Sequence, residues 1–244
     1  MQSTEFRTGV IKPIECVKEA WQLIKPDYWI LFAILLVGAL IGAFTLYVLI
    51  GAMMCGIMYC YLRRIDGYSV QFDDLWKGFS FFWPSLPAAI LIVVPLVIWI
   101  LILTVTLYLP IVMSAVMGNR LSGDELIATF GGVFLVDLIV AIVMISFHTL
   151  LTFAFPLIVD RGLKGFAPIA VSARAVVKNL GGIGGLIIMN FLMVLCGELA
   201  CGIGLYFVMP LLMATTLVAY RKVFPALHTP HLNPPPPNAY SGLQ

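Results

Sequence analysis

Four polar side chains lie inside the long apolar runs of this chain and could do chemistry there: Asp137, His148, Asn190 and Glu198. Asp137 and His148 are 11 residues apart, which on a helix places them about 20° apart around the axis and about 16 Å apart along it. Asn190 and Glu198 lie in the next apolar run. Ionisable groups inside a membrane are costly and often mark a pathway or a ligand site. The four residues therefore predict a polar site between two neighbouring helices.

Two interpretations of these residues remain open. In the first, they line a path for protons or for a small solute. In the second, Asp137 and Glu198 reach the outer membrane surface, and His148 makes one hydrogen bond to a neighbouring helix. The second interpretation is favoured, because the sequence places no acidic side chain clearly at the middle of a span.

The sequence has no motif that is typical of catalysis or of metal binding. Its five cysteines do not have the spacing of metal ligands. No nucleophile motif and no zinc-protease motif is present, and the histidines of the tail form no metal-binding pattern. We therefore expect no catalytic residue, no metal site and no cofactor.

The elements that must position the four polar residues are predicted to be membrane helices. Of the 244 residues, 61% are hydrophobic and 11% are charged, whereas a soluble domain is typically about 25% charged. Four apolar stretches can hold spans of about 20 residues, and the first and last are long enough to form hairpins. We predict an all-α membrane protein with six spans, at 28–44, 47–62, 86–109, 133–156, 181–199 and 203–220.

The distribution of basic residues supports this count. With the N-terminus inside the cell, 13 of the 14 lysines and arginines lie on the cytoplasmic side, and Arg120 alone lies outside. Cytoplasmic loops carry an excess of such residues. We expect a multi-pass protein of the inner (cytoplasmic) membrane with both termini in the cytoplasm. It would have an amphipathic cytoplasmic segment at 1–27, a six-helix domain at 28–222 and a proline-rich disordered tail at 223–244.

Three segments between the apolar runs have apolar residues at helical spacing: 10–24, 72–79 and 166–177. Such amphipathic helices either lie among lipid headgroups or pack on the helix bundle, and the pattern allows both. The first and third each precede a hairpin-length apolar run, and these runs end in Tyr61 and Tyr220, each close before basic residues. This similarity is typical of an internal repeat with two related halves.

Glycines at several positions predict close helix packing. Gly38 and Gly42 form a GxxxG pattern in the first span, and Gly197 lies near the second predicted hairpin turn. Small residues allow helices to approach closely, and in a glycine-rich apolar chain the contact is more often internal than between subunits. A further cluster at 181–185 opens the fifth span, and its spacing differs from that of a phosphate-binding loop.

Short motifs in the chain resemble a known family. They are DLWKGF at 74–79, FPLIVDRG at 155–162 and a segment from Gly202 through Pro210 to Arg221. With them, residues from about 12 to about 225 resemble a group of uncharacterised bacterial integral membrane proteins. That group is related to the membrane domain attached to some glycerophosphodiester phosphodiesterases. The resemblance implies a six-helix inner-membrane module without catalytic residues, because the hydrolase chemistry of such fusions resides in a separate soluble domain.

Two classes of function follow from these observations. The first is a non-enzymatic scaffold or accessory subunit that contacts membrane lipid or other membrane-protein subunits, and no nucleic acid. The alternative is a transporter of a small solute or of protons, with the polar site between spans four and five. Sparse intramembrane charge favours the first class, and the repeat favours the second.

Overall fold

The computed structural model describes residues 5–116, 122–199 and 202–226. These residues form nine α-helices and two 3-10 helices, and they contain no strand. The elements are α1 (Pro13–Ile24), η1 (Lys25–Asp27), α2 (Tyr28–Phe44), α3 (Ile50–Ile65), η2 (Phe72–Phe81), α4 (Phe82–Val116), α5 (Gly123–Leu150), α6 (Ala154–Arg161), α7 (Ala167–Lys178), α8 (Leu180–Leu199) and α9 (Ile203–Val223). The all-α prediction is therefore confirmed for the described residues. Arg120 and the prolines at 234–237 lie outside them.

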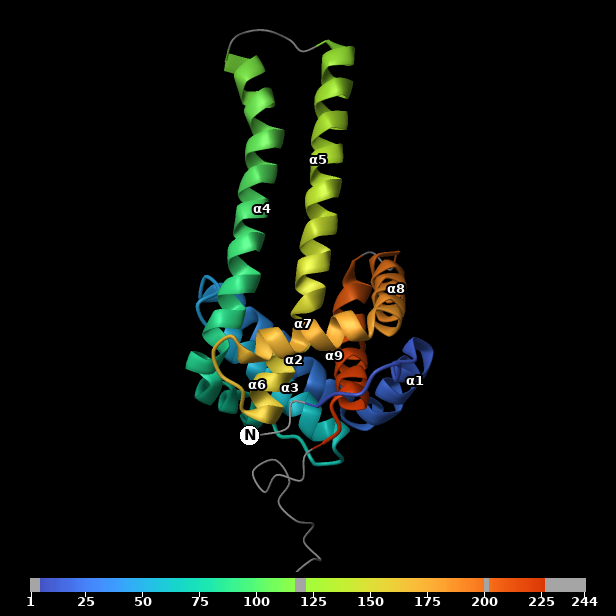
Figure 1. Ribbon diagram of the computed structural model, residues 1–244. Helices are drawn as coiled ribbons and strands as arrows, with labels where there is room; N and C mark the ends of the chain where they lie inside the picture. The colour runs from blue at the N-terminus through green and yellow to red at the C-terminus, as the bar shows by residue number, and fades with distance from the viewer. Residues whose placement is uncertain (1–4, 117–121, 200–201, 227–244) are drawn as a thin grey trace, which may run out of the picture.

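The molecule has two parts of very different height (Figure 1). α4 and α5 pair with each other and rise far above everything else, and together they are called the long hairpin below. The remaining helices form a compact group around the lower ends of α4 and α5, called the body. The upper ends of α8 and α9 lie well below the upper ends of the long hairpin. With 35 residues, α4 is about 52 Å long.

Five stretches of the described residues are long and apolar enough to cross a membrane, so this is a multi-pass membrane protein by length and composition. They are Pro13–Phe44, Phe72–Val116, Gly123–Arg161, Leu180–Leu199 and Ile203–Val223. The second predicted span, 47–62, corresponds to α3, which has only 16 residues and falls short of the roughly 20 that a span needs. It lies inside the body, where it packs against α2, η2, α6 and α9. The structure therefore shows five such stretches where the sequence predicted six spans.

The predicted fourth span, 133–156, has the wrong bounds. α5 begins ten residues earlier, at Gly123, because Ser122 and Glu125 form a reciprocal capping box at its N-terminus. It ends at Leu150, and α6 begins at Ala154 as a separate short helix. Pro156 explains the break, because it has no N–H and its ring would clash with the carbonyl of Thr152 in a continuous helix. The described fourth span therefore sits higher in the molecule than expected.

A side chain from α7 holds this break in place. The Ser172 hydroxyl donates to the Leu150 carbonyl at 2.7 Å and accepts the Phe153 N–H at 3.0 Å. Ser172 is completely buried. It therefore supplies partners to two backbone groups that the interrupted helix leaves without their usual bonds.

The three amphipathic segments pack on the body and also expose apolar side chains. α1 buries Cys16, Ala20 and Ile24, chiefly against α9, while Trp21 stays 44% exposed. η2 crosses α3 so closely that a Cβ on Gly78 would collide with the Ala52 carbonyl. α7 lies across the lower end of α5 (Figure 1). The outward faces of these segments carry large apolar residues, namely Ile14, Trp21, Trp76, Phe79, Phe166 and Val177.

The glycines predicted to pack helices lie at close contacts within the body. A Cβ on Gly38 would lie 2.9 Å from the Ile57 side chain, and one on Gly42 would lie 2.8 Å from that of Ile50. Both contacts join α2 to α3. A Cβ on Gly197 would lie 2.9 Å from the Leu205 Cα, on α9. All three contacts are internal to this chain.

The glycine cluster at 181–185 receives the N-terminal segment, residues 5–12, and the residue that follows it. A Cβ on Gly182 would lie 2.6 Å from the Ile11 Cβ, and one on Gly185 would lie 2.6 Å from the Pro13 ring. Backbone bonds hold the same segment, since the Arg7 N–H donates to the Val223 carbonyl at 2.9 Å. The N-terminal segment is therefore bound to the start of α8 and to the end of α9.

The same segment is also held by Asn179, between α7 and α8. The Gly9 N–H donates to Asn179 Oδ1 at 2.8 Å, and Asn179 Nδ2 donates to the Arg7 carbonyl at 3.2 Å. Asn179 is buried. One amide side chain thus satisfies two backbone groups of a segment that belongs to no helix or strand.

Candidate functional site

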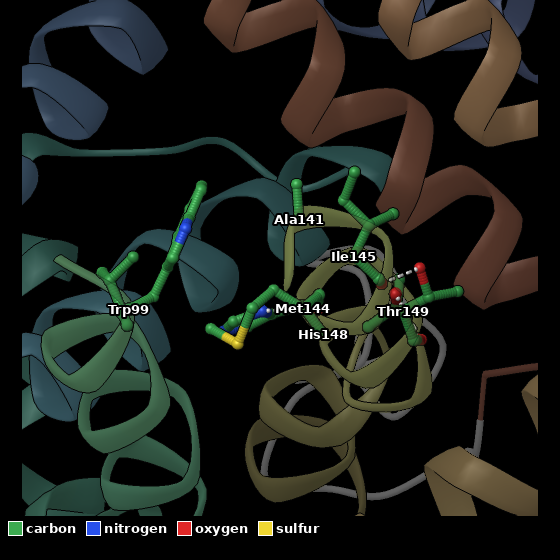
Figure 2. Close-up of a pocket in the computed structure, with 8 residues that line it drawn as sticks. Trp99, Ala141, Met144, Ile145, His148 and Thr149 are labelled. Carbon is green, nitrogen blue, oxygen red and sulfur yellow. Dashed lines mark hydrogen bonds between the residues drawn. The ribbon is translucent and has the colours of Figure 1, made fainter. Parts of the chain in front are cut away.

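A groove between the two arms of the long hairpin contains part of the predicted polar site. It has a volume of about 380 Å³ and is open to one side. Figure 2 shows Trp99 on α4 across from Met144 and His148 on α5, and Ala141, Ile145 and Thr149 of α5 also line the groove. Leu96 and Thr152 complete the lining. The walls are almost entirely apolar, and His148 supplies the ionisable group.

Asp137 lies just above this groove on α5 and is bound to Trp99. The indole Nε1–H donates to Asp137 Oδ1 at 2.8 Å. Asp137 is at the middle of α5, and Trp99 is at the middle of α4. The sequence had placed Asp137 near the outer end of its span. Within the helix, Asp137 is central because α5 begins at Gly123, well before the predicted start.

His148 lies about three helical turns below Asp137, on nearly the same side of α5. Its ring contacts two carbonyls. Its Nδ1 is 2.9 Å from the Met144 carbonyl of its own helix, and its Nε2 is 3.4 Å from the Ile92 carbonyl of α4. A neutral imidazole has only one N–H, and a carbonyl can only accept. A neutral His148 therefore satisfies one contact at a time, whereas the protonated ring can donate to both.

The structure does not bring Asn190 and Glu198 to this groove. Both are on α8, which packs against α9, α1 and α7, whereas α5 packs against α4 and α7. Asn190 Oδ1 is buried and has no hydrogen-bond partner among the described residues. Glu198 is exposed near the upper end of α8. The four predicted residues thus do not form one site. Asp137 and His148 are on α5, and Asn190 and Glu198 are on α8.

A second groove, which the sequence did not indicate, adjoins the first. Its volume is about 410 Å³, and Thr152 lines both grooves. It lies where α2, α3 and α9 meet, and four methionines line it: Met54, Met58, Met209 and Met213. Methionine side chains are flexible and polarisable, so such walls adapt to differently shaped apolar groups. Thr152 thus borders one groove in the long hairpin and another in the body.

A buried ionic network at the foot of the body was also missed. Asp160 accepts a hydrogen bond from the Tyr220 hydroxyl at 2.7 Å and lies 2.8 Å from Arg221 Nη1. Arg221 donates through Nε and Nη2 to the two oxygens of Asp66, at 2.8 and 2.6 Å. Arg161 Nε lies 3.0 Å from the Asp160 carboxylate. The Arg161 Nε and Arg221 Nη1 contacts are ionic approaches without hydrogen-bond geometry.

This network joins the ends of three helices, α3, α6 and α9. Asp160, Arg161 and Tyr220 are buried, so their charges and hydroxyl are compensated inside the body. Two further ion pairs, which are more exposed than the network, lie outside it: Arg64 with Asp27 at 2.8 Å and Lys222 with Glu19 at 2.8 Å. Asp160, Arg161 and Arg221 belong to the motifs that carry the family resemblance, and this is the signal that could have drawn attention to them.

No family model, no curated protein and no solved structure matches the chain. Within 5–116, 122–199 and 202–226, no group of three or more His, Cys, Asp or Glu side chains could hold a metal ion.

Proposed function

We propose that this chain is a non-enzymatic scaffold or accessory subunit of a membrane assembly, and that the long hairpin is the surface through which it contacts other subunits. The observation that carries the proposal is the height and exposure of α4 and α5. In the most apolar windows of the two stretches that contain them, 11% and 0% of the residues are buried. The other long apolar stretches bury more, up to 39% for α9.

The height of the long hairpin supports a protein partner in addition to lipid. The hydrocarbon core of a bilayer is about 30 Å thick, whereas α4 is apolar over 35 residues, about 52 Å. α2 has 17 residues, about 25 Å. α4 is therefore longer than the hydrocarbon core is thick, so part of the apolar surface of the hairpin lies outside the hydrocarbon. Tilting, bilayer thickening or association with other helices relieves such a mismatch, and extended exposed apolar surface typically marks an interaction site.

The topology that we propose has six spans, with the short helix α3 as the second, and both termini in the cytoplasm of the inner membrane. The basic residues support it, because 13 of 14 then lie on the cytoplasmic side. The exposed Trp21, Trp76 and Phe79 on α1 and η2 support contact of these helices with lipid headgroups.

The internal repeat and the family resemblance form part of the same proposal. In both halves an amphipathic helix, α1 or α7, precedes a pair of packed helices, α2 with α3 or α8 with α9. The family resemblance supports the absence of an enzymatic role, since it points to a membrane module whose hydrolase partner is a separate domain.

Site-specific photo-crosslinking in the native membrane tests the proposal. A photoreactive residue replaces Val105 or Leu135 on the long hairpin, and a matched control replaces Leu180 on α8, which has a similar exposed fraction. We expect discrete protein adducts from the two hairpin positions and only lipid adducts from Leu180. Lipid adducts alone at all three positions would contradict the proposed role of the hairpin.

Transport is the second candidate, and the two adjoining grooves favour it. They meet at Thr152, one turn from His148, and they run from the long hairpin to the contact between the two halves. Proton or solute flux into liposomes containing the purified chain tests this function. We then expect Thr152→Trp, which fills the junction, to stop the flux. Absence of flux in the wild type excludes the candidate.

A further inference from the structure

The Asp137 carboxylate lies at the middle of α5, and its hydrogen bonds within the described residues are incomplete. Its Oδ1 accepts the Trp99 indole N–H, and its Oδ2 has no hydrogen-bond partner among the described residues. α4 and α5 contain no lysine or arginine. The nearest titratable residue on α5 is His148, about 16 Å away along the axis. Nothing in the long hairpin therefore neutralises this side chain.

The surroundings of Asp137 make such a state unfavourable in lipid. Its neighbours on the outward faces of the hairpin are aliphatic or aromatic and exposed, including Ile98, Phe134 and Ile139. An uncompensated charge inside a membrane is costly, and acidic residues within apolar spans usually pair with another group. A cation from another helix would supply both the opposite charge and hydrogen-bond donors for Oδ2.

We propose that Asp137, held by Trp99, is the docking point for a transmembrane helix of another membrane protein that carries a lysine or arginine at the level of Asp137. This inference rests on the proposed scaffold function and names the chemistry of the partner. Charge complementarity selects the occupant. A second copy of this chain does not fit, because its long apolar helices α2, α4, α5 and α8 contain no lysine or arginine, and the basic residues of α3 and α9 lie in the last turn.

Trp99 acts as a positioning residue in this site. Its indole fixes the carboxylate through Oδ1 and leaves Oδ2 available, so the acceptor is oriented before the partner arrives. Because the bond joins the middle of α4 to the middle of α5, it also keeps the two arms in register. Orientation of this kind lowers the cost of binding.

Association with designed helices in liposomes tests the inference with the full chain. The probes are two leucine-alanine peptides of about 20 residues, one with a central lysine and one with a central leucine. Energy transfer between a dye on the peptide and a dye on the protein measures association. We expect the lysine peptide to bind the wild type about tenfold more tightly than the leucine peptide. Asp137→Asn should abolish this preference, whereas Asp124→Asn, at the exposed start of α5, should retain it.

Either of two results would overturn the inference: equal binding of both peptides by the wild type, or a lysine preference that persists in Asp137→Asn. Trp99→Phe separates positioning from charge, because we expect it to weaken the preference without abolishing it. Photo-crosslinking at Leu135 shows whether the docking inference alone has failed or the scaffold function has failed as well. Protein adducts that remain in Asp137→Asn would preserve the scaffold and show that it uses the apolar surface alone.

Discussion

Replacement of Arg221 by methionine should destabilise the body through the loss of one charge. The substitution keeps most of the volume and the apolar stem of the side chain. It removes both hydrogen bonds to Asp66 and the 2.8 Å ionic contact with Asp160. The Asp66 side chain is 13% exposed, and its only partner among the described residues is Arg221. The variant therefore leaves a nearly buried carboxylate without a partner.

The expected magnitude follows from which carboxylate loses its partners. Asp160 keeps the Tyr220 hydroxyl and the neighbouring Arg161 guanidinium, so Asp66 carries most of the cost. Removal of one member of a buried ion pair typically costs about 3–5 kcal/mol, and we expect the lower end, about 3 kcal/mol.

Lys222 provides a matched control on the next residue. It pairs with Glu19 at 2.8 Å, but the two side chains are 24% and 49% exposed. Pairs of this kind contribute about 0.2–1 kcal/mol, so Lys222→Met should cost little. Reversible unfolding in mixed micelles, followed by tryptophan fluorescence, gives the free energy of unfolding of both variants. Asp66→Asn added to Arg221→Met should recover about 1 kcal/mol, because an amide tolerates burial better than an unpaired carboxylate.

Equal losses in the two methionine variants would refute this reasoning. So would a loss below about 1 kcal/mol for Arg221→Met, since that is the range of an exposed pair. In either case the network would contribute no more than a surface contact.

Two further predictions concern other contacts of the body. Gly185→Leu should displace the N-terminal segment, because a Cβ at this position meets the Pro13 ring. Gly184→Leu is the control, because its side chain enters open space. Hydrogen exchange at residues 5–12 should rise only in the Gly185→Leu variant. Ser172→Ala should lower the thermal unfolding midpoint, because two buried backbone groups lose their partner at a cost of about 1–3 kcal/mol. Ser146→Ala is the control, because it removes only an exposed hydrogen bond within α5. Equal midpoints in the two variants would contradict the bridging role of Ser172.

The sequence predicted the positions of most helices, because apolar runs must be helical in lipid. The first predicted span, 28–44, matches α2, and the last two agree with α8 and α9 to within three residues. The start of α5 could also have been predicted, since Ser122 and Glu125 have capping-box spacing. Missing that signal displaced Asp137 from the middle of its helix to the end.

The site was harder to predict because its contacts join residues far apart in the chain. Helical spacing predicted Asp137 and His148 on nearly the same side of α5, and the structure places His148 in the groove below Asp137. It gave no information on whether α5 would face α8, so Asn190 and Glu198 were grouped with Asp137 without a contact between the helices. The ionic network joins Asp66, Asp160 and Arg221 across 155 residues, and no local pattern encodes such pairing.

The binding of the N-terminal segment to Val223 has a consequence for biogenesis. Membrane proteins are synthesised from the N-terminus, so residues 5–12 leave the ribosome before any of the groups that hold them. Their partners at Asn179, the glycine cluster and Val223 come from the final third of the chain. Residues 5–12 therefore gain their full set of partners only after α9 has been synthesised. A chain truncated before α9 would contain the whole long hairpin but would lack the Val223 carbonyl that binds the Arg7 N–H.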